Sequence, residues 1–237
     1  MPKVFLIPTP LHDEAPCAYQ PALTGLTLFV VENAKSARAS LKKIVEGIDL
    51  RACEFLEANE HTDEKQWQDI FEQVKGKDIG VVSEAGMPCV ADPGSRLVKW
   101  AHTHDYQVIP LVGPNAIIMA LAASGLSGQQ FTFHGYLPRE LNQRIRVIKA
   151  LEQESLQFDR THIFIEAPHH NKSLFIDLVN HCQETTLISI ASNLTAVSQY
   201  VSTKSAKQWR LVDQPLIDKI PTVFLMQASH SNVQRRR

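Results

Sequence analysis

The strongest constraint on the fold is the alternation of short aliphatic runs with longer amphipathic stretches along the chain. In the first half this pattern predicts strands at 3–8, 27–32, 51–55, 78–83 and 107–111, and helices at 34–46, 63–75 and 94–104. Strands that alternate with helices in this way form a mostly parallel sheet covered on both faces. The expected fold class is therefore α/β.

The second half repeats the theme. A helix is expected from Gly113-Pro114 onward, since proline suits the first helical position. Further strands are predicted near 130–136, 161–166, 185–191 and 221–227, and helices near 140–153 and 169–182. We therefore expect two α/β domains, 1–113 and 114–237, with mostly parallel or mixed sheets and a small-molecule cleft between them.

Composition and missing motifs exclude several classes of protein. The formal net charge of −1 gives no global field that would attract nucleic acid. No apolar run approaches the roughly 20 residues that cross a bilayer, and the N-terminus lacks a signal-peptide pattern, so a cytoplasmic protein is expected. No two of the 10 glycines are two apart, which excludes a G-x-G-x-x-G loop, and no P-loop, H-E-x-x-H or G-x-S-x-G motif is present.

The most informative segment is SEAGMPCVADPG at 83–94, directly after a predicted strand. Ligands of open α/β sheets collect beyond the carboxyl ends of the strands, where this loop lies. Gly86 permits close backbone approach, and Pro88 and Pro93 stiffen the loop, so it is suited to gripping a polar cofactor. An ordinary βα connection capped by Asp92 is the alternative interpretation.

Three further loops follow predicted strands and share this stiff character: IPTP at 7–10, LVGPNA at 111–116 and FIEAPHHN at 164–171. Asn115 and Ala116 fall on the first turn of a predicted helix, where backbone N–H groups point outward. Each loop is a weak signal alone, whereas convergence of all four on one cleft would indicate a binding site.

These segments resemble the tetrapyrrole methylase superfamily, the class III S-adenosylmethionine-dependent methyltransferases. The matching stretches are IPTP, EAGMPCVADPG, PLVGPNA with ALAASGL, FTFHGYLPRE and IEAPHH. Within the superfamily the chain most resembles the bacterial 16S ribosomal-RNA cytidine 2′-O-ribose methyltransferases. The resemblance implies a homodimer of two-domain chains that bind S-adenosyl-L-methionine between the domains. It places around the cofactor Pro8, Ser83, Glu84, Ala85, Gly86, Met87, Pro88, Asn115, Ala116, Glu166, Ala191, Pro221 and Thr222.

Methylation of a ribose hydroxyl releases a proton, so a positioned base would help. Glu32, at the end of a predicted strand, matches an acidic position of the family and is the first candidate for orienting the acceptor or removing its proton. The alternative is a strand-end carboxylate that pairs with Lys35 or faces solvent.

The sequence departs from the RNA-methylating members in loops expected near the acceptor. LHDEAP at 11–16 replaces their usual Gly-Asn-Leu, and Glu32-Asn33-Ala34-Lys35 replaces Glu-Asp-Thr-Arg. Ser192, Asn193 and Ala196 stand where relatives have an Arg-Glu pair and a lysine, and Glu84 replaces the commoner Asp. We therefore hypothesise that cofactor use is retained while the acceptor has changed or is held less tightly.

Three functions stay open from the sequence. An RNA ribose methyltransferase acting on the small ribosomal subunit would need a basic entrance, for which the segment 139–149 with Arg139, Arg144, Arg146 and Lys149 is the best candidate. A methyltransferase for a small molecule such as a tetrapyrrole fits the near-neutral charge. A non-catalytic protein that binds S-adenosylmethionine is the third.

Overall fold

The computed structural model describes residues 1–12, 23 and 25–228. The chain forms two compact units, Met1–Asn115 and Ala116–Arg237. Within the described residues, no helix is both long and apolar enough to span a membrane.

The first unit contains a sheet of five parallel strands in the order β3-β2-β4-β1-β5. The strands are β1 (Lys3–Ile7), β2 (Leu28–Val31), β3 (Glu54–Glu57), β4 (Ile79–Val82) and β5 (Gln107–Pro110). All five lie close to their predicted positions. The third begins later than expected because residues 49–52 form a turn, in which the Arg51 and Ala52 amides donate to Asp49.

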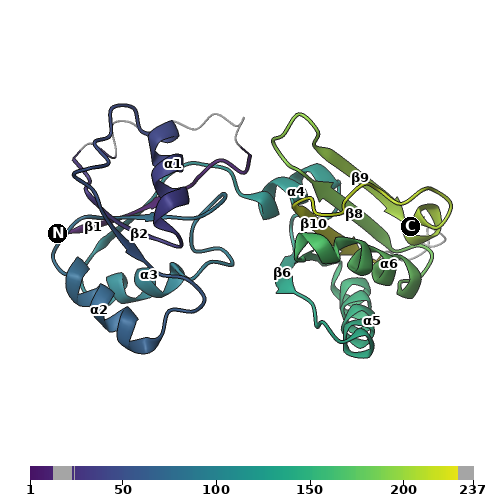
Figure 1. Ribbon diagram of the computed structural model, residues 1–237. Helices are drawn as coiled ribbons and strands as arrows, with labels where there is room; N and C mark the ends of the chain where they lie inside the picture. The colour runs from purple at the N-terminus through teal and green to yellow at the C-terminus, as the bar shows by residue number, and fades with distance from the viewer. Residues whose placement is uncertain (13–22, 24, 229–237) are drawn as a thin grey trace. The chain divides into compact units, whose positions relative to one another are not determined.

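Helices cover both faces of this sheet, as the alternation predicts. Helices α2 (Glu64–Val74) and α3 (Ser95–His102) pack on one face, and α1 (Ala34–Ile44) packs on the other (Figure 1). The start of α2 is set by a capping box, in which Asp63 accepts from the Gln66 amide and the Gln66 side chain accepts from the Asp63 amide. Its apolar residues Trp67, Ile70, Phe71 and Val74 recur at helical spacing and are buried on one face.

The second unit contains a mixed sheet in the order β6-β7-β10-β8-β9. Its strands are β6 (Phe131–Tyr136), β7 (Thr161–Ile165), β8 (Leu187–Ser192), β9 (Tyr200–Ser205) and β10 (Thr222–Gln227). Only β6 and β7 pair in parallel among these strands, and the other three pairings are antiparallel. The second half therefore does not repeat the parallel theme of the first, because β8 turns back directly into β9 without a crossover helix.

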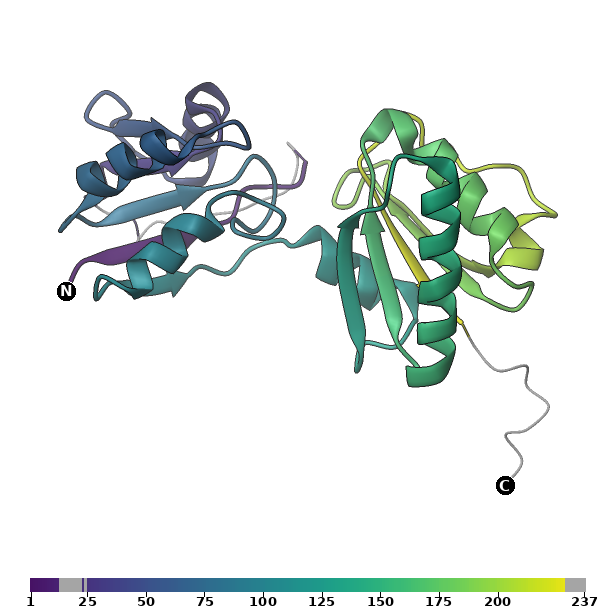
Figure 2. The same ribbon diagram turned by 90° about the horizontal axis from the view of Figure 1, so that it is seen from below.

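Helix α4 (Ala116–Ser124) packs on one face of the second sheet, and α5 (Leu141–Phe158), α6 (Asn171–His181) and the short α7 (Ala206–Trp209) pack on the other. Figure 2 shows the long helix α5 lying along this sheet. The sequence prediction missed β9 and α7 and ended α5 too early. Helix α5 continues to Phe158, and Asp159 at its C-cap adopts a left-handed conformation with φ 50°.

Candidate functional site at the carboxyl edge of the first sheet

The topology of the first unit places a ligand crevice at the carboxyl ends of β1 and β4. These two strands are neighbours, yet their connections leave in opposite directions: β1 leads across β4 to β2, and β4 leads across β1 to β5. Such a switch point is where open α/β sheets bind their ligands. The loops that follow the two strands are the predicted segments 7–10 and 83–94.

Hydrogen bonds join these two loops directly. The amides of Thr9 and Gly86 each donate to the other residue's carbonyl oxygen at 3.0 Å. The Thr9 hydroxyl donates to the Ser83 carbonyl at 3.3 Å, and the Ser83 hydroxyl donates to the Gly86 carbonyl at 2.7 Å. Because Thr9 and Ser83 are buried, these hydrogen bonds are shielded from water and hold the two loops together.

Gly86 lies where three loops approach one another. Its φ of +79° is a conformation that favours glycine, and a Cβ there would lie 2.9 Å from Cδ2 of Leu11 and 3.3 Å from the carbonyl oxygen of Pro114. The segment that follows β5 therefore meets the other two loops in the same place. The structure thus brings together Pro8, the segment 83–88 and the residues leading to Asn115.

Replacing Gly86 with alanine is expected to disturb this junction, because its positive φ is strained for alanine and the new Cβ would push against Leu11 and Pro114. We expect the affinity for S-adenosylmethionine, measured by calorimetry, to fall by about tenfold or more, which corresponds to a strain of about 1–3 kcal/mol. Gly128→Ala is the control, since nothing lies within 4 Å of a Cβ there. Equal affinities of the two variants would contradict the role given to Gly86.

Three carboxylates gather beside this junction. Glu32 follows β2 and hydrogen-bonds with the side chain of Asp92, while its Oε1 lies 3.5 Å from the amide nitrogen of Glu84. Asp92 also accepts from the Gly94 amide at 2.6 Å, but Gly94 is the N-cap of α3 and no side chain caps this helix, so the expected cap at Asp92 is wrong. The sequence analysis placed Glu32 and Glu84 in the site but read Asp92 only as a cap.

The pKa of the Glu32 carboxyl group lies well above its ordinary value. Burial, reinforced by the negative charge of Asp92 and the hydrogen bond between the two side chains, raises the pKa of Glu32 to about 7. A hydrogen bond between two carboxyl groups requires a proton on one of them, so burial and Asp92 both favour the protonated form of Glu32. The alternative interpretation was a strand-end carboxylate that pairs with Lys35. The side chains that raise the pKa of Glu32 are instead acidic.

The predicted residues of the second unit meet at one edge of their own sheet. The start of β10 lies between the ends of β7 and β8, so that Thr222 pairs with Ser192 and Val223 pairs with Ala191 and Ile165. Asn193 donates its amide to the Pro221 carbonyl at 2.9 Å. Glu166 follows β7, and its Oε1 accepts from the Ala167 amide at 2.8 Å. Glu166, Ala191, Pro221 and Thr222 are thus brought together.

Backbone strain concentrates in the site loops of both units. Cys89 and Ala91 of the 83–94 loop have φ of 68° and 56°, and Asn193 and Thr195, which follow β8, have φ of 50° and 73°. The Thr195 hydroxyl oxygen is also buried without a hydrogen-bond partner among the described residues. Rigid, strained loops and an unpaired polar atom suit a polar cofactor held mainly by backbone groups.

The basic entrance expected at 139–149 is only partly present. Arg144 does not belong to a basic entrance, because it is buried and its Nε donates to Asp177 at 2.6 Å. Arg139, Arg146 and Lys149 are exposed. His134 is half-buried against Phe164, with its Nε2 2.8 Å from Nδ1 of His162, so it packs within the second unit.

Of the divergent segment 11–16, only Leu11 and His12 lie within the described residues.

Comparison with known proteins finds a family match over most of the chain. Residues 26–208 match the model of the Tetrapyrrole (Corrin/Porphyrin) Methylases. The ribosomal RNA small subunit methyltransferase I of Buchnera aphidicola (subsp. Schizaphis graminum) is 30% identical over 230 residues, which cover 94% of this chain and 77% of that protein. The protein of the same name from Escherichia coli O157:H7 is 29% identical, with 81% of this chain and 65% of that protein covered.

Solved structures with the same fold include the methyltransferase CobJ, with a TM-score of 0.62, 20% identity and coverage of 96% of this chain and 95% of that one. Diphthine synthase has a TM-score of 0.54 at 14% identity and covers 86% of this chain and 79% of that one. At these identities the likeness shows a shared fold. The α/β fold class expected from the sequence is confirmed.

Proposed function

Because the chain belongs to the tetrapyrrole methylase family and is an S-adenosylmethionine-dependent methyltransferase, we propose that it methylates a ribose 2′-hydroxyl of small-subunit ribosomal RNA. The observation that carries the proposal is the half-buried carboxyl group of Glu32, whose pKa is raised to about 7 beside the hydrogen-bonded loops of the first unit. The names of the Buchnera and Escherichia relatives support the choice of acceptor.

The cofactor is proposed to bind the loop groups of both units. The first group is Pro8, Ser83, Glu84, Ala85, Gly86, Met87, Pro88 and Asn115, and the second is Ala116, Glu166, Ala191, Pro221 and Thr222. The locked backbone around Gly86 and the strained backbone near Thr195 support these assignments. When bound, S-adenosylmethionine supplies an electrophilic methyl carbon on a sulfonium centre, so the protein needs to provide binding, alignment and proton removal.

Glu32 is proposed to accept the proton of the ribose hydroxyl. The hydroxyl oxygen would bond to the methyl carbon while the bond from that carbon to the sulfonium sulfur breaks, and S-adenosylhomocysteine would leave. A base is most effective when its pKa lies near the working pH, and burial together with Asp92 brings the pKa of Glu32 to about 7. The Glu84 amide near Oε1 steadies the ionised form. Asp92 is a positioning residue in this scheme, because it acts on the acceptor only through Glu32.

Radiolabelled methyl transfer to immature small ribosomal subunits tests the proposal. Purified chain and labelled S-adenosylmethionine are expected to put label into 16S RNA, and nuclease digestion followed by chromatography is expected to recover it as a 2′-O-methylated nucleoside. Mature subunits from the same cells serve as the control, because their acceptor is already methylated. Label on a base, or none in RNA despite cofactor binding, would reject ribose methylation and favour a small-molecule acceptor.

A further inference from the structure

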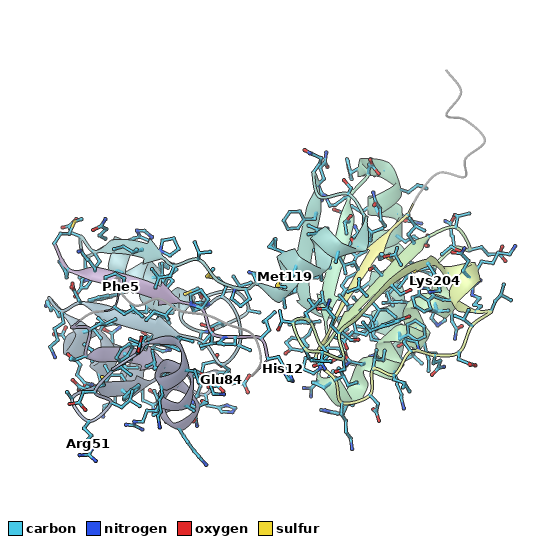
Figure 3. The ribbon with its side chains drawn as sticks, turned by 90° about the horizontal axis from the view of Figure 1, so that it is seen from above. Phe5, His12, Arg51, Glu84, Met119 and Lys204 are labelled. Carbon is cyan, nitrogen blue, oxygen red and sulfur yellow. The ribbon has the colours of Figure 1, made fainter. Side chains whose placement is uncertain are left out.

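A pocket of the first unit has Glu84, one of the three carboxylates, in its wall. It has a volume of about 250 Å³ and is formed by residues 10–12, by Glu84 and Ala85, and by Ser40 and Lys43 of α1. Figure 3 shows the side chains of His12 and Glu84 on the same side of this unit. Since Glu84 also contacts Glu32, the pocket begins next to the proposed base.

The helix that forms one wall of the pocket is strongly basic. Helix α1 reads AKSARASLKKI and carries four basic residues and no acidic one, although the whole chain has a net charge of −1. Lys35, Arg38, Lys42 and Lys43 are all exposed. Lys35, Arg38 and Lys42 follow one another at spacings of three and four residues and form one basic stripe, while Lys43 lies on the neighbouring face that lines the pocket. Basic residues clustered along a helix are the electrostatic footprint of a nucleic-acid contact. The basic segment expected from the sequence was 139–149, and this one in α1 was not predicted.

The two ends of the pocket differ in charge. Ser36, Ser40 and Lys43 follow one another at spacings of four and three residues, so they share one face of α1. At the Ser36 end, the serine hydroxyl donates to Oε1 of Glu84 at 2.6 Å. Lys43 lies two turns further along, roughly 10 Å away along the helix axis. The pocket therefore runs from a carboxylate end near Glu32 to a cationic end.

His12 adds an unused polar group to this wall. Its Nδ1 is buried and has no hydrogen-bond partner among the residues that the structure describes. A buried nitrogen without a partner costs free energy unless a ligand completes it. His12 lies in the segment where the chain departs from its RNA-methylating relatives, so this group belongs to the divergent part of the site.

We propose that this pocket holds the sugar-phosphate backbone of the RNA acceptor, with a phosphate between Lys43, Ser40 and His12 and the neighbouring ribose toward Glu32. The inference rests on the proposed function and names the part of the acceptor that this site binds. The volume is below the roughly 300–1,000 Å³ of pockets that enclose whole drug-sized ligands, which fits one backbone unit better than a tetrapyrrole ring system.

Binding of a short, cytidine-rich, single-stranded RNA to the full chain saturated with S-adenosylhomocysteine tests the inference without requiring methylation. Fluorescence anisotropy at several salt concentrations is expected to show that Lys43→Ala raises the Kd about tenfold, as loss of a charged hydrogen bond would, and lowers the salt slope by about one. Lys43→Arg is expected to keep most of the affinity, and His12→Ala is expected to weaken binding.

Lys42→Ala is the matched control, because Lys42 is also exposed in the last turn of α1 but does not line the pocket. We expect its Kd to rise much less. Equal effects of the two substitutions would show only the general field of the helix and would overturn the pocket assignment, as would RNA binding that is independent of salt. If binding depends on Lys43 but the wild-type chain labels no RNA, the proposed function fails while the binding inference holds.

Discussion

Replacing Glu32 with glutamine is expected to lower the single-turnover rate of methyl transfer by about 10²- to 10⁴-fold, the usual contribution of a general base. Glutamine keeps the size of the side chain but cannot accept the ribose proton. The affinity for S-adenosylmethionine, measured by calorimetry, is expected to stay unchanged, since the role of Glu32 concerns the acceptor. Full activity of this variant would remove Glu32 from the mechanism.

The pH profile gives this prediction a second readout. Only ionised Glu32 accepts a proton, so the wild-type rate is expected to rise with pH through a midpoint of about 7. Asp92→Asn removes a neighbouring negative charge while keeping an oxygen for the Gly94 amide, and it should therefore move the midpoint to lower pH. A midpoint that does not move would contradict the coupling between the two side chains.

The raised pKa also links Glu32 to stability. Its folded-state pKa of about 7 exceeds the ordinary value of 4.5, so the folded first unit loses stability as pH rises between these values and Glu32 ionises. The Glu32→Gln variant is therefore expected to unfold at the same or a higher temperature than the wild type at pH 8. Such a variant, inactive but not destabilised, separates loss of the base from loss of the fold.

Replacing Arg144 with alanine is expected to destabilise the second unit by about 3–5 kcal/mol, because it leaves the carboxylate of Asp177 buried without its partner. The two side chains are only 9% and 10% exposed and join α5 to α6, and Arg144 also donates to the Ser173 hydroxyl at 3.1 Å. Urea unfolding followed by circular dichroism is expected to show a transition at lower urea concentration.

Two control variants distinguish the effect of breaking the buried ion pair from the effect of removing one positive charge. Arg146→Ala removes an exposed arginine from the same helix and is expected to change stability by less than about 0.5 kcal/mol. The double variant Arg144→Met/Asp177→Leu replaces both partners with apolar groups and is expected to recover much of the lost stability. If Arg144→Ala unfolds like Arg146→Ala, the pair does not hold the two helices together.

Local patterns predicted most helices and strands because their signals lie within a few residues of each other. The apolar spacing of Trp67, Ile70, Phe71 and Val74 and the cap at Asp63 identify α2 without any tertiary information. The same kind of signal was available for Arg144, which lies on one helical stripe with Ile148, Leu151 and Ser155, all buried. Its charge led the sequence analysis to place it on the surface.

Strand β9 gave a weaker signal. The last four residues of its sequence YVSTKS are all polar, so no apolar alternation is present. Among the described strands it pairs with β8 alone, at the edge of the second sheet. Half-buried edge strands need few apolar residues, so hydrophobic periodicity does not mark them. The antiparallel pairing of the second sheet likewise depends on contacts between distant segments.

The sequence by itself determined the α/β class, the approximate strand positions, the stiff loops at strand ends and the family to which they belong. The tertiary structure alone decided that β2 and β4 are neighbours, which brings Glu32 to Asp92 and Glu84, and that Ser40 and Lys43 of α1 line one pocket with Glu84. The physical reason is range: helix and turn signals act over a few residues, whereas the pKa of a carboxyl group depends on burial and charges contributed by strands far apart in the chain.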